Sequence, residues 1–137
     1  MSKPRALLVD DNQAILDCLV KMLGRDYEII GAIRDGPRML DAVAILKPDI
    51  VVMDISMPEM SGLELAQLMQ RNPPAPPVVF VTVHDDTEFM EAAQAVGAAG
   101  YVVKSSMEKE LKPALEAALK GHRFVSRDFR SSTGGRR

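Results

Sequence analysis

Short apolar runs alternate with longer amphipathic segments along most of this chain. Four of the runs lack the polar–apolar alternation of a half-solvated strand, so we expect parallel strands that are buried on both faces. They cover residues 6–9, 50–53, 78–83 and 101–103. A fifth run, 27–33, is interrupted by Gly31 and is typical of an edge strand. The pattern therefore predicts a parallel sheet of five strands.

The segments between these runs have the spacing of amphipathic helices. The first helix is expected to turn one face towards the core, made of Ile15, Cys18, Leu19, Met22 and Leu23. Turn and capping residues mark the other helices: Gly36-Pro37 to Pro48, Ser61 to about Asn72, Asp85-Asp86 to Gly97, and a last helix after Ser105 that contains Pro113. Alternating strands and helices predict a three-layer α/β domain with right-handed crossovers.

Length and composition are those of one globular domain. The 137 residues are 47% hydrophobic and 26% charged, and a net charge of -2 gives no general attraction to nucleic acid or anionic lipid. No apolar stretch approaches the roughly eighteen residues of a membrane span, so no membrane association is expected. Cys18 is the single cysteine, which favours a reducing compartment and a cytoplasmic location.

The regular pattern stops after Gly121. The remaining residues are rich in arginine, serine and glycine, which is the composition of a linker or a solvated tail. We therefore expect a folded domain over residues 1–121, followed by a linker or tail over residues 122–137.

Three aspartates follow two of the predicted strands: Asp10 and Asp11 end the first, and Asp54 ends the third. Ligands bind at the carboxyl ends of strands in open α/β sheets, so these residues are candidates for one shared site. Carboxylates about 4 Å apart repel by roughly 4 kcal/mol per pair at an effective dielectric near 20. A hard divalent cation such as Mg²⁺ is the simplest way to hold them together. The plainer alternative is that Asp11 only caps a helix and Asp54 only opens a turn.

Two further polar residues end strands at the same edge of the predicted sheet. Thr82 ends the fourth strand and Lys104 ends the fifth. A hydroxyl and an ammonium add little to a metal site, but they complete a site for a transferred phosphoryl group, which needs in-line positioning and countercharge on its oxygens. Asp54 would then be the nucleophile that accepts the phosphoryl group.

Four stretches of the sequence resemble the signature of the receiver domain of bacterial two-component response regulators. They are Val9-Asp10-Asp11, residues 53–62, Val81-Thr82 and residues 100–104, in matching order and spacing within residues 6–119. The resemblance implies a flavodoxin-like (βα)5 fold with strand order 2-1-3-4-5. It also implies phosphorelay signal transduction, in which a sensor histidine kinase transfers a phosphoryl group to this chain.

The resemblance implies a metal site and an acceptor. The Mg²⁺ ligands would be Asp11, Asp54 and the backbone carbonyl of Ser56, while Asp10 would act through water or hydrogen bonds. Asp54 would be the phosphoacceptor. The chain would catalyse only its own phosphorylation and dephosphorylation, so it would not be an enzyme in the usual sense.

The resemblance also implies how the phosphoryl group is sensed. Thr82 and Lys104 would bind its oxygens, and Tyr101 would change rotamer as an aromatic switch. Ser56 and His84 lie two residues beyond Asp54 and Thr82, at positions that in this family flank the path of hydrolytic water. We expect both residues to influence the lifetime of the phosphoryl group. The alternative for His84 is that it is a solvated loop residue without such a role.

The kinase is expected to dock over the start of the first helix, beside the acidic crevice. Leu16 and Val20 are apolar, four residues apart and outside the expected core face of this helix. Together with Ala14 and Ile15 they form the predicted docking patch. The alternative is that these side chains are exposed without a partner.

Residues 100–105 and 121–126 look most like the NarL/FixJ-type branch of the family. Members of that branch usually continue into a helix-turn-helix domain that binds DNA. The resemblance thus implies transcription regulation through an output domain outside this chain, with a homodimer formed on phosphorylation. The alternative is a stand-alone receiver that acts through protein–protein interaction.

Two other classes share parts of this pattern. Hydrolases of the haloacid dehalogenase type also form an aspartyl phosphate with Mg²⁺, but they need a second aspartate two positions after the nucleophile, where this chain has Ser56. A flavodoxin-like cofactor binder would place a phosphate-binding loop after the first strand, where Asp10 and Asp11 would repel the phosphate. The chain departs from many receivers at Ser105, where they have proline, and at Val83, where they have a smaller residue.

Overall fold

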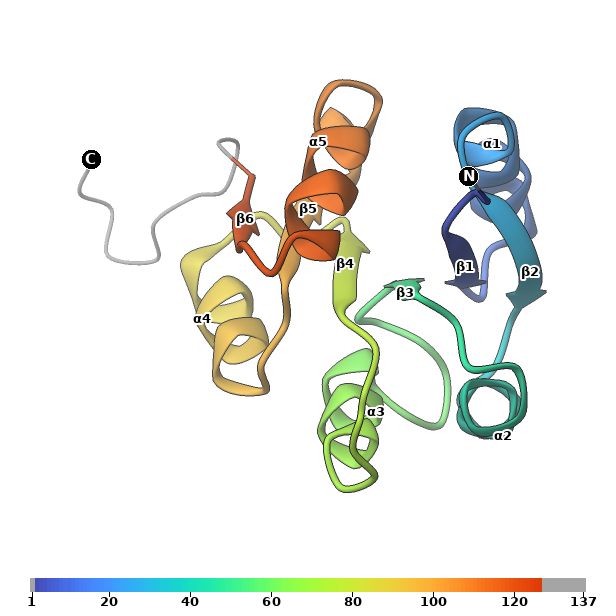
Figure 1. Cartoon of the computed structure of the whole chain (residues 1–137). Helices are drawn as coiled ribbons and strands as arrows, with labels where there is room; N and C mark the ends of the chain where they lie inside the picture. The colour runs from blue at the N-terminus through green and yellow to red at the C-terminus, as the bar shows by residue number, and fades with distance from the viewer. Residues whose placement is uncertain (1, 127–137) are drawn as a thin grey trace.

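The computed structural model describes residues 2–126, which form a three-layer α/β domain (Figure 1). The described strands are β1 (Arg5–Val9), β2 (Glu28–Ile33), β3 (Ile50–Met53), β4 (Val78–Thr82), β5 (Gly100–Val103) and β6 (Phe124–Val125). They form one sheet in the order β2-β1-β3-β4-β5-β6, and every pair of neighbours is parallel. The flavodoxin-like order expected for the first five strands is confirmed.

The helices cover both faces of this sheet. They are α1 (Gln13–Leu23), α2 (Gly36–Leu46), α3 (Gly62–Met69), α4 (Thr87–Ala95) and α5 (Met107–Leu119), the last preceded by the 3-10 turn η1 (Lys104–Ser106). Figure 1 shows α1 and α5 above the sheet and α2, α3 and α4 below it. Within residues 2–126, none of the helices has the length and apolar character needed to cross a membrane.

Side-chain caps fix where four of the helices begin. Asn12, Asp35 and Asp86 each accept hydrogen bonds from the first turn of α1, α2 and α4, which satisfies amides that lack a partner within the helix. Ser61 and Glu64 form the capping box that their spacing predicted for α3. These caps place each helix start next to the carboxyl end of the preceding strand.

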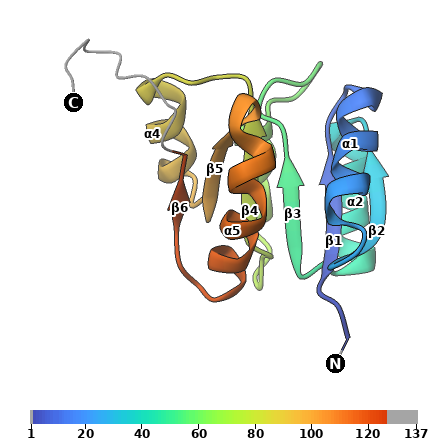
Figure 2. The ribbon, with the colours of Figure 1, turned by 90° about the horizontal axis from the view of Figure 1, so that it is seen from above.

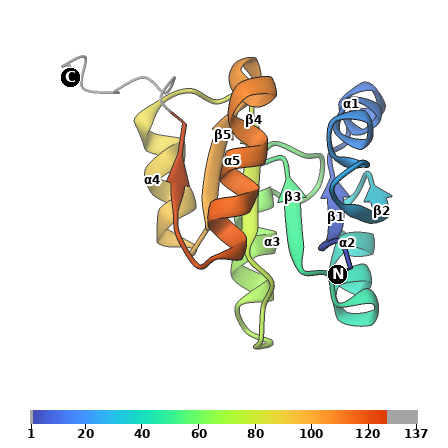
Figure 3. The ribbon, with the colours of Figure 1, turned by 45° about the horizontal axis from the view of Figure 1, so that its top comes forward.

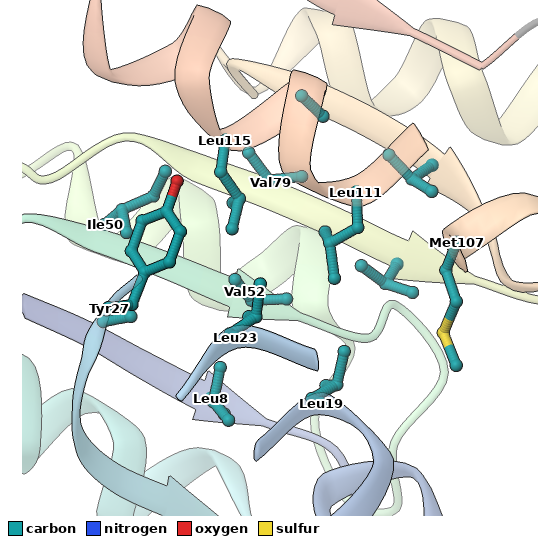
Figure 4. Close-up of a cluster of buried hydrophobic side chains, with 14 of the residues drawn as sticks. Leu8, Leu19, Leu23, Tyr27, Ile50, Val52, Val79, Met107, Leu111 and Leu115 are labelled. Atoms are coloured by element: carbon teal, nitrogen blue, oxygen red, sulfur yellow. The ribbon is translucent and has the colours of Figure 1, made fainter. Parts of the chain in front are cut away.

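Two apolar cores fill the space on either side of the sheet. The first core cluster joins α1 and α5 to the upper face, and Leu19, Leu23, Leu111 and Leu115 interdigitate there above Leu8 (Figure 4). The second core cluster packs α2, α3 and α4 against the other face.

The inner face of α1 is wider than expected, because it includes Leu16 as well as the five predicted residues, all of which lie in or pack against the first core cluster. Leu16 is 1% exposed and lies in the first core cluster, so the prediction that it stands outside the core is wrong. Ile15 is only half buried, and Val20 is 41% exposed. The reason is that apolar residues cover most of the circumference of this helix, so their spacing does not show which row faces the sheet. Within the predicted docking patch, Ala14 and Val20 are exposed.

The sheet continues beyond the expected end of the domain. Gly121 adopts a left-handed conformation (φ +80°), and the chain then turns back to form β6 beside β5. Phe124 and Val125, within the stretch expected to be a linker or tail, therefore form a sixth strand of the sheet. Residues 127–137 of the predicted tail lie outside the described part of the chain.

Candidate functional site

The carboxyl ends of β1 and β3 bring the predicted acidic residues together. Asp10 follows β1 and Asp54 follows β3, and their side chains are buried. The amide of Asp10 donates to the carbonyl of Ile33 at 3.0 Å, and the amide of Asp54 donates to that of Val9 at 3.0 Å. Sheet hydrogen bonding thus extends one residue past each strand and holds both aspartates rigidly.

Asp10, Asp11 and Asp54 form a compact carboxylate cluster. One oxygen from each side chain lies within 4.8 Å of the others, an arrangement that could hold a metal ion. Asp11 is half exposed and so leaves an approach from solvent, whereas the other two are buried. The donors are all hard oxygens, and a site with one open side fits Mg²⁺, which keeps several waters, better than zinc. Ser56 is exposed in the loop that follows Asp54.

Lys104 reaches from the end of β5 into this cluster. Its Nζ lies 2.9 Å from Asp10 Oδ2 and 3.4 Å from Asp54 Oδ2. Burial alone would lower the pKa of Lys104, but the hydrogen bond to Asp10 and the negative charges of Asp54 and Asp10 outweigh it and raise that pKa. The ammonium therefore stays charged and supplies a positive charge next to both carboxylates.

Burial makes the ionised form of Asp54 unfavourable. Burial raises the pKa of its carboxyl group, Lys104 opposes that shift, and the charge of Asp10 adds to it. Asp54 Oδ1 accepts a hydrogen bond of 2.7 Å from the amide of Ile55, which fixes the orientation of the carboxylate. A carboxylate that is oriented but poorly compensated is ready to bind a cation or to react with an electrophile.

Two residues that the sequence analysis did not single out also shape the acidic site. Gly62 donates its amide to the carbonyl of Ile55 at 2.7 Å, and a Cβ at this position would lie 2.2 Å from the backbone oxygen of Asp54. Only glycine permits this close approach. Arg34 donates from Nε and Nη2 to the carbonyl of Asp11, at 3.2 and 3.0 Å, and thereby fixes its backbone.

Thr82 and Tyr101 meet at one backbone segment. Thr82 is buried, and its hydroxyl oxygen accepts a hydrogen bond of 3.2 Å from the amide of His84. The carbonyl of His84 in turn accepts the phenolic hydroxyl of Tyr101 at 2.7 Å. Tyr101 is 1% exposed, so its ring points into the protein and does not project from the surface. Burial, together with the charges of Asp86 and Asp85, raises the pKa of Tyr101, which keeps the hydroxyl protonated as a donor.

The side chain of His84 contacts Ser56 and Phe89. Its Nε2 is 2.5 Å from the hydroxyl oxygen of Ser56, and its ring stacks on Phe89 with the centroids 3.8 Å apart. Ser56, Phe89 and Asp11 also line a surface groove of about 510 Å³. The two residues predicted to influence phosphoryl lifetime are therefore in direct contact at the mouth of the site.

The comparison with protein families decides the class of the protein. The family model of the response regulator receiver domain matches residues 6–116, which include every residue of this site. The chain belongs to the response regulator receiver family. Hydrolases of the dehalogenase type and flavodoxin-like cofactor binders are thereby set aside. The branch expected from the sequence is also supported, because similar solved structures include receivers of LuxR- and NarL-type regulators.

The similar proteins are regulators that are longer than this chain. The response regulator GacA of Pseudomonas viridiflava is 33% identical over 124 residues, which are 89% of this chain and 58% of GacA. The transcriptional regulatory protein PdtaR of Mycobacterium tuberculosis is 32% identical over 125 residues, which are 90% of this chain and 60% of PdtaR. This receiver domain thus spans about three-fifths of the length of these relatives.

Solved structures share both the fold and part of the sequence. A LuxR-family response regulator from Aurantimonas sp. SI85-9A1 superposes with a TM-score of 0.88 at 32% identity, covering 93% of this chain and 92% of the other. The signal receiver domain of NarL from Mycobacterium tuberculosis superposes with a TM-score of 0.84 at 26% identity, covering 89% and 100% respectively.

Proposed function

We propose that this receiver domain accepts a phosphoryl group on Asp54 in a Mg²⁺-dependent reaction, with a sensor histidine kinase as the donor. The observation that carries the proposal is the cluster of Asp10, Asp11 and Asp54, into which the Lys104 ammonium projects at 2.9 and 3.4 Å from two of the carboxylates. A purely structural cluster of buried carboxylates would be a costly arrangement, because burying like charges opposes folding. The location is expected to be the cytoplasm, where such kinases present their phosphohistidine.

The transfer is a displacement at phosphorus. An oxygen of the Asp54 carboxylate attacks the phosphorus of the phosphohistidine in line, the new oxygen–phosphorus bond forms as the phosphorus–nitrogen bond breaks, and the imidazole nitrogen leaves with the electron pair. The Ile55 amide, 2.7 Å from Oδ1, orients the carboxylate for this attack. Lys104 then offers its charge to the transferred oxygens, and Thr82 offers its hydroxyl.

The metal would be held by Asp11, Asp54 and the backbone carbonyl of Ser56, with Asp10 supporting them. When bound, Mg²⁺ neutralises the crowded carboxylates and the charge that develops on the transferred oxygens. Arg34 donates its hydrogen bonds to the backbone carbonyl of Asp11 and leaves the Asp11 carboxylate available for the metal.

The proposal is tested by labelling with a small phosphodonor. Incubation with acetyl phosphate and Mg²⁺ should add one phosphoryl group, detected by intact-protein mass spectrometry and located by peptide mapping. EDTA should prevent the labelling, and Asp54→Asn should abolish it. Unchanged labelling of Asp54→Asn at a similar rate would refute Asp54 as the acceptor, and unchanged labelling in EDTA would refute the role of the metal.

The kinase is proposed to dock over the start of α1, next to the crevice. Of the residues expected there, Ala14 and Val20 are exposed and Ile15 is half buried, so these three form the available patch, without Leu16. Val20→Glu should slow transfer from the kinase several-fold and leave labelling by acetyl phosphate unchanged. Lys21→Glu, at the exposed neighbouring position, is the control for charge alone. Equal slowing in both variants would contradict an apolar patch at Val20.

The consequence of phosphorylation is proposed to be control of an output domain that regulates transcription. The support is that the longer relatives include regulators of transcription, with this receiver matching about three-fifths of PdtaR. A homodimer formed on phosphorylation would bring two such output domains together. The second candidate is a receiver that acts through a separate protein partner. It would use the same phosphorylation of Asp54. A separate protein would then bind the phosphorylated surface, and no covalently attached output domain would be needed.

A further inference from the structure

Strand β6 is hydrogen-bonded to the backbone of Tyr101, whose side chain contacts the loop after Thr82. The amide of Ser126 donates a hydrogen bond of 2.7 Å to the carbonyl of Tyr101. The side chain of Tyr101 points the other way and donates its hydroxyl to the carbonyl of His84. Tyr101 therefore links β6 to the loop that follows Thr82. Figures 2 and 3 both show β6 alongside β5 at the edge of the sheet.

Several contacts hold β6 in place despite its short length. Phe124 packs against the first core cluster and Val125 against the second, so the strand is attached to both faces of the sheet. The amide of Phe124 donates to the carbonyl of Ala99 at 3.0 Å. Ser126 is 1% exposed, and its hydroxyl donates to the carboxylate of Glu110 on α5. These contacts fix the point from which the rest of the chain departs.

A strand of two residues has little stability of its own. Its order depends on the edge of β5 and on the surface of α5, so local release of β6 should cost much less free energy than unfolding of the domain. Elements of this kind serve as conformational switches when another site biases their equilibrium. The residue placed to bias β6 is Tyr101, because a change of its rotamer would disturb the backbone that β6 binds.

We propose that β6 is a strap that couples the position of Tyr101 to the polypeptide following Ser126. The inward Tyr101 side chain and the docked β6 belong to one state, because Tyr101 bonds to His84 through its hydroxyl and to Ser126 of the β6 segment through its carbonyl. The inference deepens the proposed function, because it takes Asp54 as the source of the signal. The coupling between Tyr101 and β6, however, is a property of the unphosphorylated chain and can be measured without any phosphodonor.

The direction of the effect follows from the same geometry. A phosphoryl group on Asp54 would draw the Thr82 hydroxyl towards it and vacate space beside β4. An inward Tyr101 fills that space, so phosphorylation should stabilise the state in which β6 is docked. Because coupling between two sites is reciprocal, a firmly docked β6 should in turn favour the phosphorylated form.

Amide hydrogen exchange of the full chain, followed by NMR, tests the coupling directly. Tyr101→Phe keeps the buried ring but removes the hydroxyl that His84 binds. The Phe124 and Ser126 amides should then exchange several-fold faster than in the parent, while amides of β1 keep their rates. Tyr27→Phe, at the other buried tyrosine, is the matched control and should leave both amides unchanged. Equal exchange of β6 in the parent and Tyr101→Phe would overturn the proposal.

A second arm measures the same amides with Mg²⁺ and the phosphoryl mimic beryllofluoride. Exchange at Phe124 and Ser126 should become several-fold slower once the Ile55 amide reports occupancy at Asp54. Occupancy with no change in β6 would overturn the strap and leave the proposed function intact. Absence of occupancy would count against the proposed function alone, and the comparison of Tyr101→Phe with its control would still decide the coupling.

Discussion

The acidic half of the site, at β1 and β3, and the hydroxyl half, at β4 and β5, differ in the charge and the hydrogen-bond partners of their side chains. Asp10, Asp11 and Asp54, at the ends of β1 and β3, are negatively charged groups within 4.8 Å of one another. On the other side, at β4 and β5, Thr82 and Tyr101 are neutral and are joined through the backbone of His84 by hydrogen bonds of 3.2 and 2.7 Å. Lys104 comes from β5 but extends into the acidic half.

This difference separates reactivity from response. The carboxylate half is held rigidly by sheet hydrogen bonds, and burial disfavours the ionised form of Asp54, which suits binding of a cation and attack on phosphorus. In the hydroxyl half, formed by Thr82 and Tyr101, the polar groups are paired with the backbone of His84. These neutral hydrogen bonds can be exchanged for others at low cost in free energy. A new dianion on Asp54 would compete for the Thr82 hydroxyl with a charge-assisted bond, which is stronger than the bond it replaces. Substitutions in the two halves should therefore have different effects.

The largest effect is expected for Asp11→Asn. The variant removes one charge from the cluster without filling the crevice, so the affinity for Mg²⁺ measured by titration calorimetry should fall at least about tenfold. Asp17→Asn is the matched control, because Asp17 is an exposed residue of α1 that accepts a hydrogen bond from Gln13. Equal affinities in the parent and Asp11→Asn would mean that the metal is bound elsewhere.

A second effect concerns stability without the metal. Since burial raises the pKa of Asp54, the folded state holds this proton more tightly than the unfolded state, and ionised Asp54 lowers stability at neutral pH. Asp54→Asn should therefore resist urea better than the parent in EDTA. The gain should shrink as the pH falls through the folded pKa and vanish below the ordinary value of 3.8, where Asp54 is protonated in both states. A variant less stable than the parent at neutral pH would contradict the burial cost assigned to ionised Asp54.

The smallest effect is expected at the mouth of the site. His84→Ala removes the contacts of the ring with Ser56 and Phe89 but leaves the backbone bonds to Thr82 and Tyr101 in place. The phosphoryl group should still form to the same extent, while its lifetime changes a few-fold because water enters differently. Ser56→Ala should shift the lifetime in the same direction. If both decay rates match the parent, neither residue influences hydrolysis.

Much of the fold and the acidic half of the site could be predicted because both follow from local pattern. Apolar runs without alternation are typical of strands covered on both faces, and the carboxyl ends of parallel strands necessarily meet at one edge. Asp10, Asp54 and Lys104 directly follow such runs, so their proximity follows from the order of the strands.

The remaining features depend on contacts between segments that are distant in sequence. Leu16 is buried in the first core cluster, whereas Ile15 packs against that cluster and stays half buried, because apolar residues surround most of α1 and their spacing does not show which row lies deepest. Arg34 contacts the backbone of Asp11, and Gly62 lies against the backbone of Asp54. Contacts of this kind leave no recognisable spacing of residues in the sequence. Strand β6 is two residues long, so only the apolar pair after the Gly121 turn could have signalled it.

The separation of reactivity from response is tested most directly by measuring both in one variant, Thr82→Ala. We predict that acetyl phosphate and Mg²⁺ still label Asp54 to the full extent, although more slowly. NMR shifts of α4 and of β5 around Tyr101, which should change in the parent when beryllofluoride binds, should stay near their unliganded values in the variant. Full labelling with distal shifts equal to those of the parent would contradict this separation, because the signal would then bypass the hydroxyl half of the site.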